Sequence, residues 1–325
     1  MTKKIKDTNS TAKKKQAVAD TSNVIPFPQK KAMPPGKDMP QHAETPPVAA
    51  IPPDEETDDA VSDIFGGGKR TGGKRPDDKQ IAMDEAQDVM YEAWDATTSK
   101  RAVTLAKKAL KISPDCADAY VLLAQETAQS PEEEITLYRQ GVEAGERALG
   151  KEIFKNAVGF FWEIFETRPY MRARAGLAEC LWDAGRREEA VGHYQDMLRL
   201  NRGDNQGNRY VLMPHLIQMW LDEKAAELFA NYSDDASAFW SYSKALLDFR
   251  KHGVSPAAGK SLRAAIKGNK HVPAYLTGRK KFPRTLPDHY GFGDDNEAVI
   301  YVEDNMTAWE KTPGALEWLA ENIKK

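Results

Sequence analysis

The side chains that most often perform catalysis are scattered along this sequence of 325 residues. The six histidines do not form a His-x-x-x-His helical pair beside a glutamate, which a zinc hydrolase would need. The sequence also contains neither a Gly-x-Ser-x-Gly motif nor a Walker phosphate loop. We therefore expect a non-enzymatic protein that has no catalytic residues, no metal site and no cofactor.

The two cysteines, Cys116 and Cys180, lie too far apart in the sequence to suggest a zinc cluster, and two are too few for a disulfide framework. Both fall within apolar helical patterns, which favours buried thiols in a reducing compartment. The basic block Lys3–Lys15 is not followed by the apolar core of a secretory signal, and no stretch approaches 18 apolar residues. We therefore expect a cytoplasmic protein without membrane insertion.

Composition divides the chain near residue 80. Residues 1–80 contain 10 of the 19 prolines and none of the Trp or Tyr residues, whereas residues 81–325 contain every Trp and Tyr. The first part also changes from a basic to a Pro-rich to an acidic stretch and ends in a Gly-rich linker. Such a segment cannot bury enough apolar surface to fold. We predict a disordered tail over 1–80 and a folded region of about 245 residues.

The folded region shows a repeat of paired helices, clearest in Met171–Asp204. Leu177, Ala178 and Leu181 mark one helix, and Ala190, Tyr194 and Met197 mark a second after a turn at Gly185. Small residues twelve positions apart let two helices approach closely. This pattern resembles the tetratricopeptide repeat, in which stacked helix pairs share one continuous core.

Looser copies of the pattern precede and follow the clear unit. They predict roughly five helix pairs in an all-α solenoid over 81–270, with an additional helix at Lys151–Thr167. In that helix Phe154, Val158, Phe161 and Phe165 would form one apolar stripe. This stripe either packs into the solenoid or forms an aromatic wall that lines the groove. The next unit is expected to begin at Asp204, which we interpret as a helix N-cap.

The C-terminal segment 271–325 breaks the repeat because three prolines exclude a long helix over 271–287. Asp294 is expected to cap a following helix, with Glu297 completing a capping box. The sequence Thr312-Pro313 predicts the start of a last helix. Its polar end would make this segment a terminal cap of the solenoid.

Several motifs together resemble the suppressor-of-tumorigenicity-seven family and its soluble bacterial relatives. They are Cys116–Ala124, Arg186–Val191 and Gly293–Tyr301 with Trp309 and Gly314–Leu316, together with the runs at 166–174 and 204–210. The resemblance covers about residues 80–322. It implies interaction through tetratricopeptide-type repeats and no established chemistry.

Candidate partner-binding residues come from the repeat positions that face the concave surface. In the clear unit these are Arg172, Glu179 and Trp182, with Arg168 opening the unit. Arg172 and Trp182 can hold a carboxylate-bearing peptide by charge and stacking. Adjacent units stack their first helices, so we also expect a polar patch in which Asn205, Gln206 and Arg209 cluster near the group Arg168–Arg174.

A basic loop provides a second candidate site. The residues are Arg279, Lys280, Lys281 and Arg284. They form either a solvated loop that covers the solenoid end or a contact for an anion or a nucleic acid. We therefore predict a scaffold that binds a protein or peptide partner in its groove. The alternative is a nucleic-acid-associated adaptor that uses the basic tail and the 279–284 loop. The oligomeric state and the identity of the partner are left open.

Overall fold

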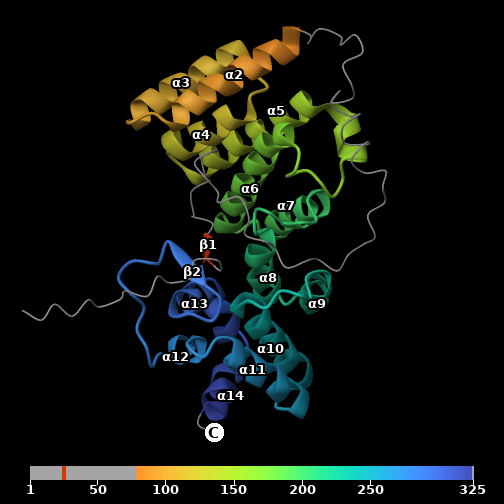
Figure 1. Ribbon diagram of the computed structural model, residues 1–325, viewed down its shortest axis with the longest axis vertical. Coiled ribbons are helices and arrows are strands. Elements are labelled where there is room, and N and C mark those ends of the chain that lie inside the picture. Colours follow the sequence, from red (N-terminus) through yellow and green to blue (C-terminus); the bar gives the residue numbers. More distant parts are fainter. Residues whose placement is uncertain (1–23, 27–77, 324–325) are drawn as a thin grey trace, which may run out of the picture.

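The computed structural model describes residues 24–26 and 78–323, which form an all-α solenoid with one short β-ribbon. Five antiparallel helix pairs follow one another along the long axis of the molecule (Figure 1). The pairs are α2 (Asp78–Trp94) with α3 (Ser99–Ile112), α4 (Ala117–Thr127) with α5 (Pro131–Asn156), α6 (Arg168–Asp183) with α7 (Arg187–Leu200), α8 (Asn208–Gln218) with α9 (Asp222–Asn231), and α10 (Ala238–His252) with α11 (Pro256–Gly268). This architecture confirms the tetratricopeptide-repeat-like prediction.

Local signals in the sequence define several helix starts. Ser130 and Ser255 each precede a proline at the first helical position, and their hydroxyls accept hydrogen bonds from the N–H groups of Glu133 and Ala258. A serine cap supplies an acceptor for one orphan N–H, and proline fits the first turn because its missing N–H would have no partner there. The helix pairs therefore begin where local chemistry favours them.

Small residues bring paired helices into close contact. Ala178 and Ala190 are completely buried between α6 and α7, as the repeat pattern predicts. Between α5 and α6 a Cβ atom on Gly176 would lie 2.1 Å from the ring of Tyr138. Only glycine fits at this position, since a larger side chain would force the two helices apart.

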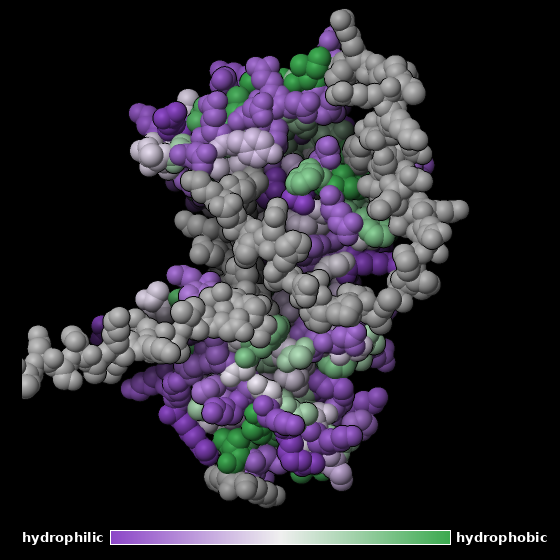
Figure 2. Space-filling model, in the orientation of Figure 1, coloured by the Kyte–Doolittle hydropathy of each residue, from purple (hydrophilic) through white to green (hydrophobic). Residues whose placement is uncertain are grey.

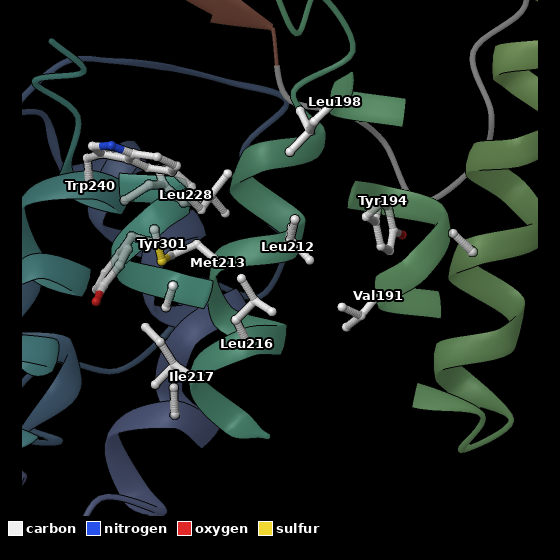
Figure 3. Close-up of a cluster of buried hydrophobic side chains, with 14 of the residues drawn as sticks. Val191, Tyr194, Leu198, Leu212, Met213, Leu216, Ile217, Leu228, Trp240 and Tyr301 are labelled. Carbon is white, nitrogen blue, oxygen red and sulfur yellow. The ribbon is translucent and has the colours of Figure 1, made fainter. Parts of the chain in front are cut away.

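The apolar side chains form two cores. A small core joins α2, α3 and α4, and a large one extends from α4 to the C-terminal helix. Figure 3 shows α8 in the middle of the large core, between Val191 and Tyr194 on α7 and Trp240 and Tyr301 of the C-terminal half. This continuous burial is the property that makes stacked helix pairs stable.

The segment predicted as an additional helix at Lys151–Thr167 has a different structure. Helix α5 ends at Asn156 after a kink at Gly150, whose φ is 71°. The chain then turns back, and the N–H groups of Gly159 and Phe161 donate to the carbonyl of Leu200 before a short 3-10 turn, η1 (Phe165–Thr167). Backbone pairing with the end of α7 overrides the helical spacing of the phenylalanines. Phe161 is buried, whereas Phe165 is 72% exposed.

Two other expected helix starts are shifted. Helix α8 begins at Asn208 after Gly207, whose φ is 72°, so Asp204 is not its N-cap residue. The Asp204 carboxylate nevertheless accepts hydrogen bonds from the N–H groups of Asn208 and Arg209. The last helix, α14 (Ala315–Asn322), begins after Gly314 rather than at Pro313, and the Thr312 hydroxyl donates backwards to the carbonyl of Ala308.

The C-terminal elements pack against the solenoid rather than only extending it. They comprise α12 (Val272–Leu276), strand β2 (His289–Gly291), α13 (Asp295–Glu310) and α14. Helix α13 lies against α8 and α10, the first helices of the last two pairs (Figure 1). The solenoid therefore holds one of its own helices against the face formed by first helices.

Most of the predicted disordered tail lies outside the described residues. The described part of the tail includes β1 (Val24–Pro26), which pairs antiparallel with β2 in the register Ile25 to Tyr290. It also includes the start of α2 at Asp78, shortly before the expected boundary. Composition predicted an unfolded arm over this part of the chain, but the structure contains the strand β1. The strand forms because backbone groups at the edge of β2 would otherwise lack partners.

Candidate protein-interaction site

The first helices of the pairs form one face of the solenoid, which we call the first-helix face. In pairs one to three it is held together by Asp118 on α4, whose side chain is completely buried. Arg172 on α6 donates from Nε to Oδ1 of Asp118 over 2.8 Å and also pairs through its second nitrogen. Gln87 on α2 donates to Oδ2 over 3.0 Å. One carboxylate therefore links three first helices.

Arg172 is consequently not available to bind a partner's carboxylate. Its side chain is only 11% exposed, and its guanidinium lies 5.6 Å from the ring centre of Trp94 on α2. A bidentate ion pair with a buried aspartate satisfies the directional donors of the arginine. The structure places Arg172 on the predicted face, but in a structural ion pair.

Arg168, one turn earlier on α6, has a different environment. Its Nε donates to the carbonyl of Trp162 over 2.8 Å, and its guanidinium lies 4.1 Å from the ring centre of Phe165. None of the carboxylates in the described residues forms an ion pair with it. Burial, together with the charge of Arg172, lowers the pKa of Arg168. Arg168 is thus a half-buried cation supported by aromatic rings.

Aromatic side chains lie near this cation, and two of them, Tyr91 and Phe165, are exposed. Tyr91 is 49% exposed and packs beside Trp94, with 5.9 Å between the ring centres. We call Tyr91, Trp94, Trp162, Phe165 and Arg168 the arginine–aromatic surface. Such residues are enriched where proteins bind one another, because they combine a large apolar area with polar groups.

Glu179 and Trp182 lie towards the opposite end of α6. Trp182 is half-buried and stacks on His215 of α8, with ring centres 3.4 Å apart and planes inclined by 13°. Glu179 is half-buried as well and acts electrostatically on Tyr194 and Cys180. Trp182 therefore contributes to packing between the third and fourth pairs, and Glu179 lies within the third pair.

The stacked His215 leads to a pH prediction. Burial, with the charge of Arg187, lowers its pKa to about 3, below the ordinary value of about 6.5 expected in the unfolded chain. Below pH 6.5, His215 therefore binds a proton in the unfolded state but stays neutral in the folded state. The free energy of unfolding consequently falls as the pH falls. We expect His215 to contribute a loss of about 2 kcal/mol in unfolding free energy between pH 7 and pH 5.

The measurement is urea unfolding of the wild-type chain and of His215→Phe at both pH values. Phenylalanine keeps the stacking on Trp182 but cannot take up a proton. The variant should lose about 2 kcal/mol less than the wild type between the two pH values. Equal losses in the two proteins would contradict a neutral, buried His215.

Of the remaining residues of the predicted polar patch, Gln206 reaches the segment Arg168–Arg174, at Met171. Arg209 binds Asp204 and Asp235, which it reaches at 3.1 Å each, and its guanidinium stacks on Tyr210. Gln206 donates weakly to the carbonyl of Met171, at 3.5 Å, and Asn205 is exposed. Arg172 and Arg209 thus each neutralise a different buried aspartate.

The predicted basic loop divides into two kinds of residue. Lys280 forms an ion pair with Asp295 at the start of α13 and lies 4.9 Å from the ring centre of Tyr275. Arg279, Lys281 and Arg284 are exposed. Within this loop, these three are the cations that form no ion pair with a carboxylate of the described residues.

Sequence reasoning missed Asp118 and Tyr91. A usable signal was present in α2, where Gln87, Tyr91 and Trp94 recur at spacings of four and three beside the buried stripe. Asp118 had no such signal, because its partner Arg172 lies 54 residues further along the chain.

The five stacked pairs and the shared first-helix face define an all-α helical-repeat protein. None of the helices that the structure describes is long and apolar enough to cross a membrane. The model of the ST7 protein family matches residues 77–324. The chain therefore belongs to the ST7 family, in agreement with the resemblance carried by the sequence motifs.

Curated relatives support this membership. The chain is 28% identical over 266 residues to a suppressor of tumorigenicity 7 protein-like from Gallus gallus, covering 73% of this chain and 47% of the relative. It is 27% identical over 268 residues to a protein ST7 homolog from Drosophila pseudoobscura pseudoobscura, covering 73% and 48%. The chain thus spans about half the length of the curated relatives it matches.

Among solved structures, the chain is similar to YrrB, described as a TPR protein with an unusual peptide-binding site. The TM-score is 0.41 at 16% identity, over 58% of this chain and 85% of YrrB.

Proposed function

We propose that this chain is a non-enzymatic scaffold that binds an extended peptide or a helix of a partner protein. The binding site is the first-helix face of the first three pairs, at the arginine–aromatic surface. One observation carries the proposal. The first-helix face of the last two pairs holds α13, so this face is shaped to accept a helix. In pairs one to three, the described helices leave the same face without such an occupant.

The side chains of the two halves support the comparison. In the C-terminal half, Phe239 and Tyr242 of α10 contact Tyr301 of α13, with ring centres 5.7 and 5.5 Å apart. In the N-terminal half, Tyr91 and Phe165 are exposed. Aromatic residues anchor interfaces because they bury much area at a small entropy cost. The exposed rings of Tyr91 and Phe165 would contact a partner in the way that Phe239 and Tyr242 contact α13.

The test is affinity capture with the full chain, followed by cross-linking mass spectrometry. The variant is Tyr91→Ser with Phe165→Ser, two exposed positions at which we expect little effect on folding. The matched control is Val254→Ser, which is 79% exposed in the turn after α10. We expect proteins that cross-link to α2 and α6 of the wild type to be retained by the control and lost by the double variant. Equal retention by all three proteins would overturn the proposal.

A further inference from the structure

Charge is strongly segregated along the C-terminal half of the chain. Residues 249–287 contain ten Lys and Arg and no Asp or Glu. Because the whole chain carries a net charge of -3, the other residues together carry -13. A positive stretch in an otherwise acidic chain calls for a specific explanation, since it attracts anionic partners that the rest of the surface repels.

Most of these cations remain unpaired within the described residues. Arg250 is buried and pairs with Asp222, and Lys280 pairs with Asp295. The other eight are exposed, and none of them has an ion-pair partner among the described residues. On α11 the residues Lys260, Arg263 and Lys267 recur at spacings of three and four, so they share one side of the helix.

Apolar side chains are exposed among the cations in the loop between α12 and β2. Phe282 is 38% exposed and Leu286 37%, and Phe292 beyond β2 is 46% exposed. Scattered surface hydrophobics need no explanation, but Phe282 and Leu286 lie within one short basic loop. On the face drawn in Figure 2, hydrophobic surface lies in separate patches among hydrophilic residues.

The loop is held at both ends. The N–H of Lys280 donates to the carbonyl of Ala274, and Tyr275 packs on Phe282 with ring centres 5.5 Å apart. At the other end, Tyr290 of β2 is buried against Phe239. Between these anchors the loop runs outside the helices (Figure 1). The two ends of the loop that carries these cations and apolar side chains are therefore held in place.

We propose that this loop, residues 277–288, docks the protein on the surface of an anionic lipid bilayer. Lysine and arginine would bind lipid headgroups while Phe282 and Leu286 enter the interfacial region, the combination by which peripheral proteins bind membranes. A nucleic acid explains the cations but offers no environment for Leu286.

The experiment is co-sedimentation of the full chain with vesicles of phosphatidylcholine containing about 30% phosphatidylserine, at about 0.1 M salt. The charge variant is Arg279→Gln, Lys281→Gln, Arg284→Gln, and the apolar variant is Phe282→Ser with Leu286→Ser. The matched control removes three exposed lysines of α3: Lys107→Gln, Lys108→Gln, Lys111→Gln. Circular dichroism melts confirm that each variant remains folded.

We expect the charge variant to bind roughly 100-fold more weakly than the wild type, because each cation near an anionic surface contributes about fivefold. The apolar variant should lose about tenfold, and the α3 control should bind like the wild type. Three results would overturn the proposal: no binding by the wild type, equal binding to vesicles of phosphatidylcholine alone, or equal losses in the charge variant and the control. Binding of the wild type to duplex RNA but not to vesicles would assign the surface to nucleic acid instead.

Discussion

Replacing Arg172 with methionine should lower the free energy of unfolding by about 3–5 kcal/mol. The change leaves the carboxylate of Asp118 fully buried, with Gln87 as its remaining side-chain donor. An uncompensated charge in such a site is costly because it has lost its water and its counter-ion. Since Asp118 joins α2, α4 and α6, we expect the loss to appear first as easier unfolding of the N-terminal pairs.

A surface ion pair provides the matched control. Arg139 on α5 pairs with Glu189 on α7 over 2.9 Å, and both side chains remain more than a third exposed. Arg139→Met should cost less than about 1 kcal/mol because water already solvates both charges. The double variant Arg172→Met with Asp118→Asn should recover part of the loss, since it also removes the buried charge. Urea unfolding followed by circular dichroism measures all four proteins. Equal losses for Arg172→Met and Arg139→Met would show that Asp118 is not the link between these helices.

Replacing Glu297 with alanine should destabilise the docking of α13 by about 4 kcal/mol. Only 1% of this residue is exposed, and its carboxylate accepts hydrogen bonds from the N–H groups of Ala238 and Gly293 and from the Asn269 side chain. These three donors belong to the start of α10, the turn before α13 and the end of α11. Alanine would leave the N–H groups of Ala238 and Gly293 without an acceptor in a buried site, and each costs about 1–3 kcal/mol. Asn269 would lose one of its two acceptors and keep its hydrogen bond to the carbonyl of Asp294.

Hydrogen exchange of the α13 amides reports this loss directly. The matched control is Glu303→Ala, an exposed position on the same helix, which should change the exchange rates little. Glu297→Gln should fall between the two, because its amide keeps one acceptor but turns a donor towards another donor. If α13 exchanges equally slowly in Glu297→Ala and Glu303→Ala, the carboxylate does not hold the helix.

The helix pairs could be predicted because they depend on local patterns. Ala178 and Ala190 occur at the spacing that paired helices need, and the structure buries both completely. Asp294 was predicted as a cap, and its carboxylate accepts from the N–H of Glu297 over 2.7 Å. These features depend on residues that lie close together in the sequence, so they can be predicted from the sequence alone.

The errors arose where distant segments compete with local spacing. The phenylalanines from Phe154 to Phe165 have helical spacing, but backbone bonds to Leu200 draw the chain into a turn instead. Helical periodicity reports how a segment would pack if it were a helix. It contains no information about a strand-like partner some 40 residues away.

The roles of the candidate site residues also depended on tertiary structure. Arg168 and Arg172 look equivalent in sequence, one helical turn apart. Asp118, more than 50 residues earlier, neutralises Arg172 and leaves Arg168 without a carboxylate among the described residues. Likewise, Glu297 was expected only to complete a cap, yet it joins three elements through one buried carboxylate.

The sequence alone therefore determined the class of protein, the paired helices and the acid-free stretch 249–287, since composition and short-range spacing encode these properties. Tertiary structure decided which first-helix face is occupied by α13, which arginines are paired and which aromatic rings remain exposed. These properties depend on contacts between residues far apart in the chain. Such contacts form only when the helix pairs stack, because stacking removes these charges from water and a buried charge is costly unless it is paired.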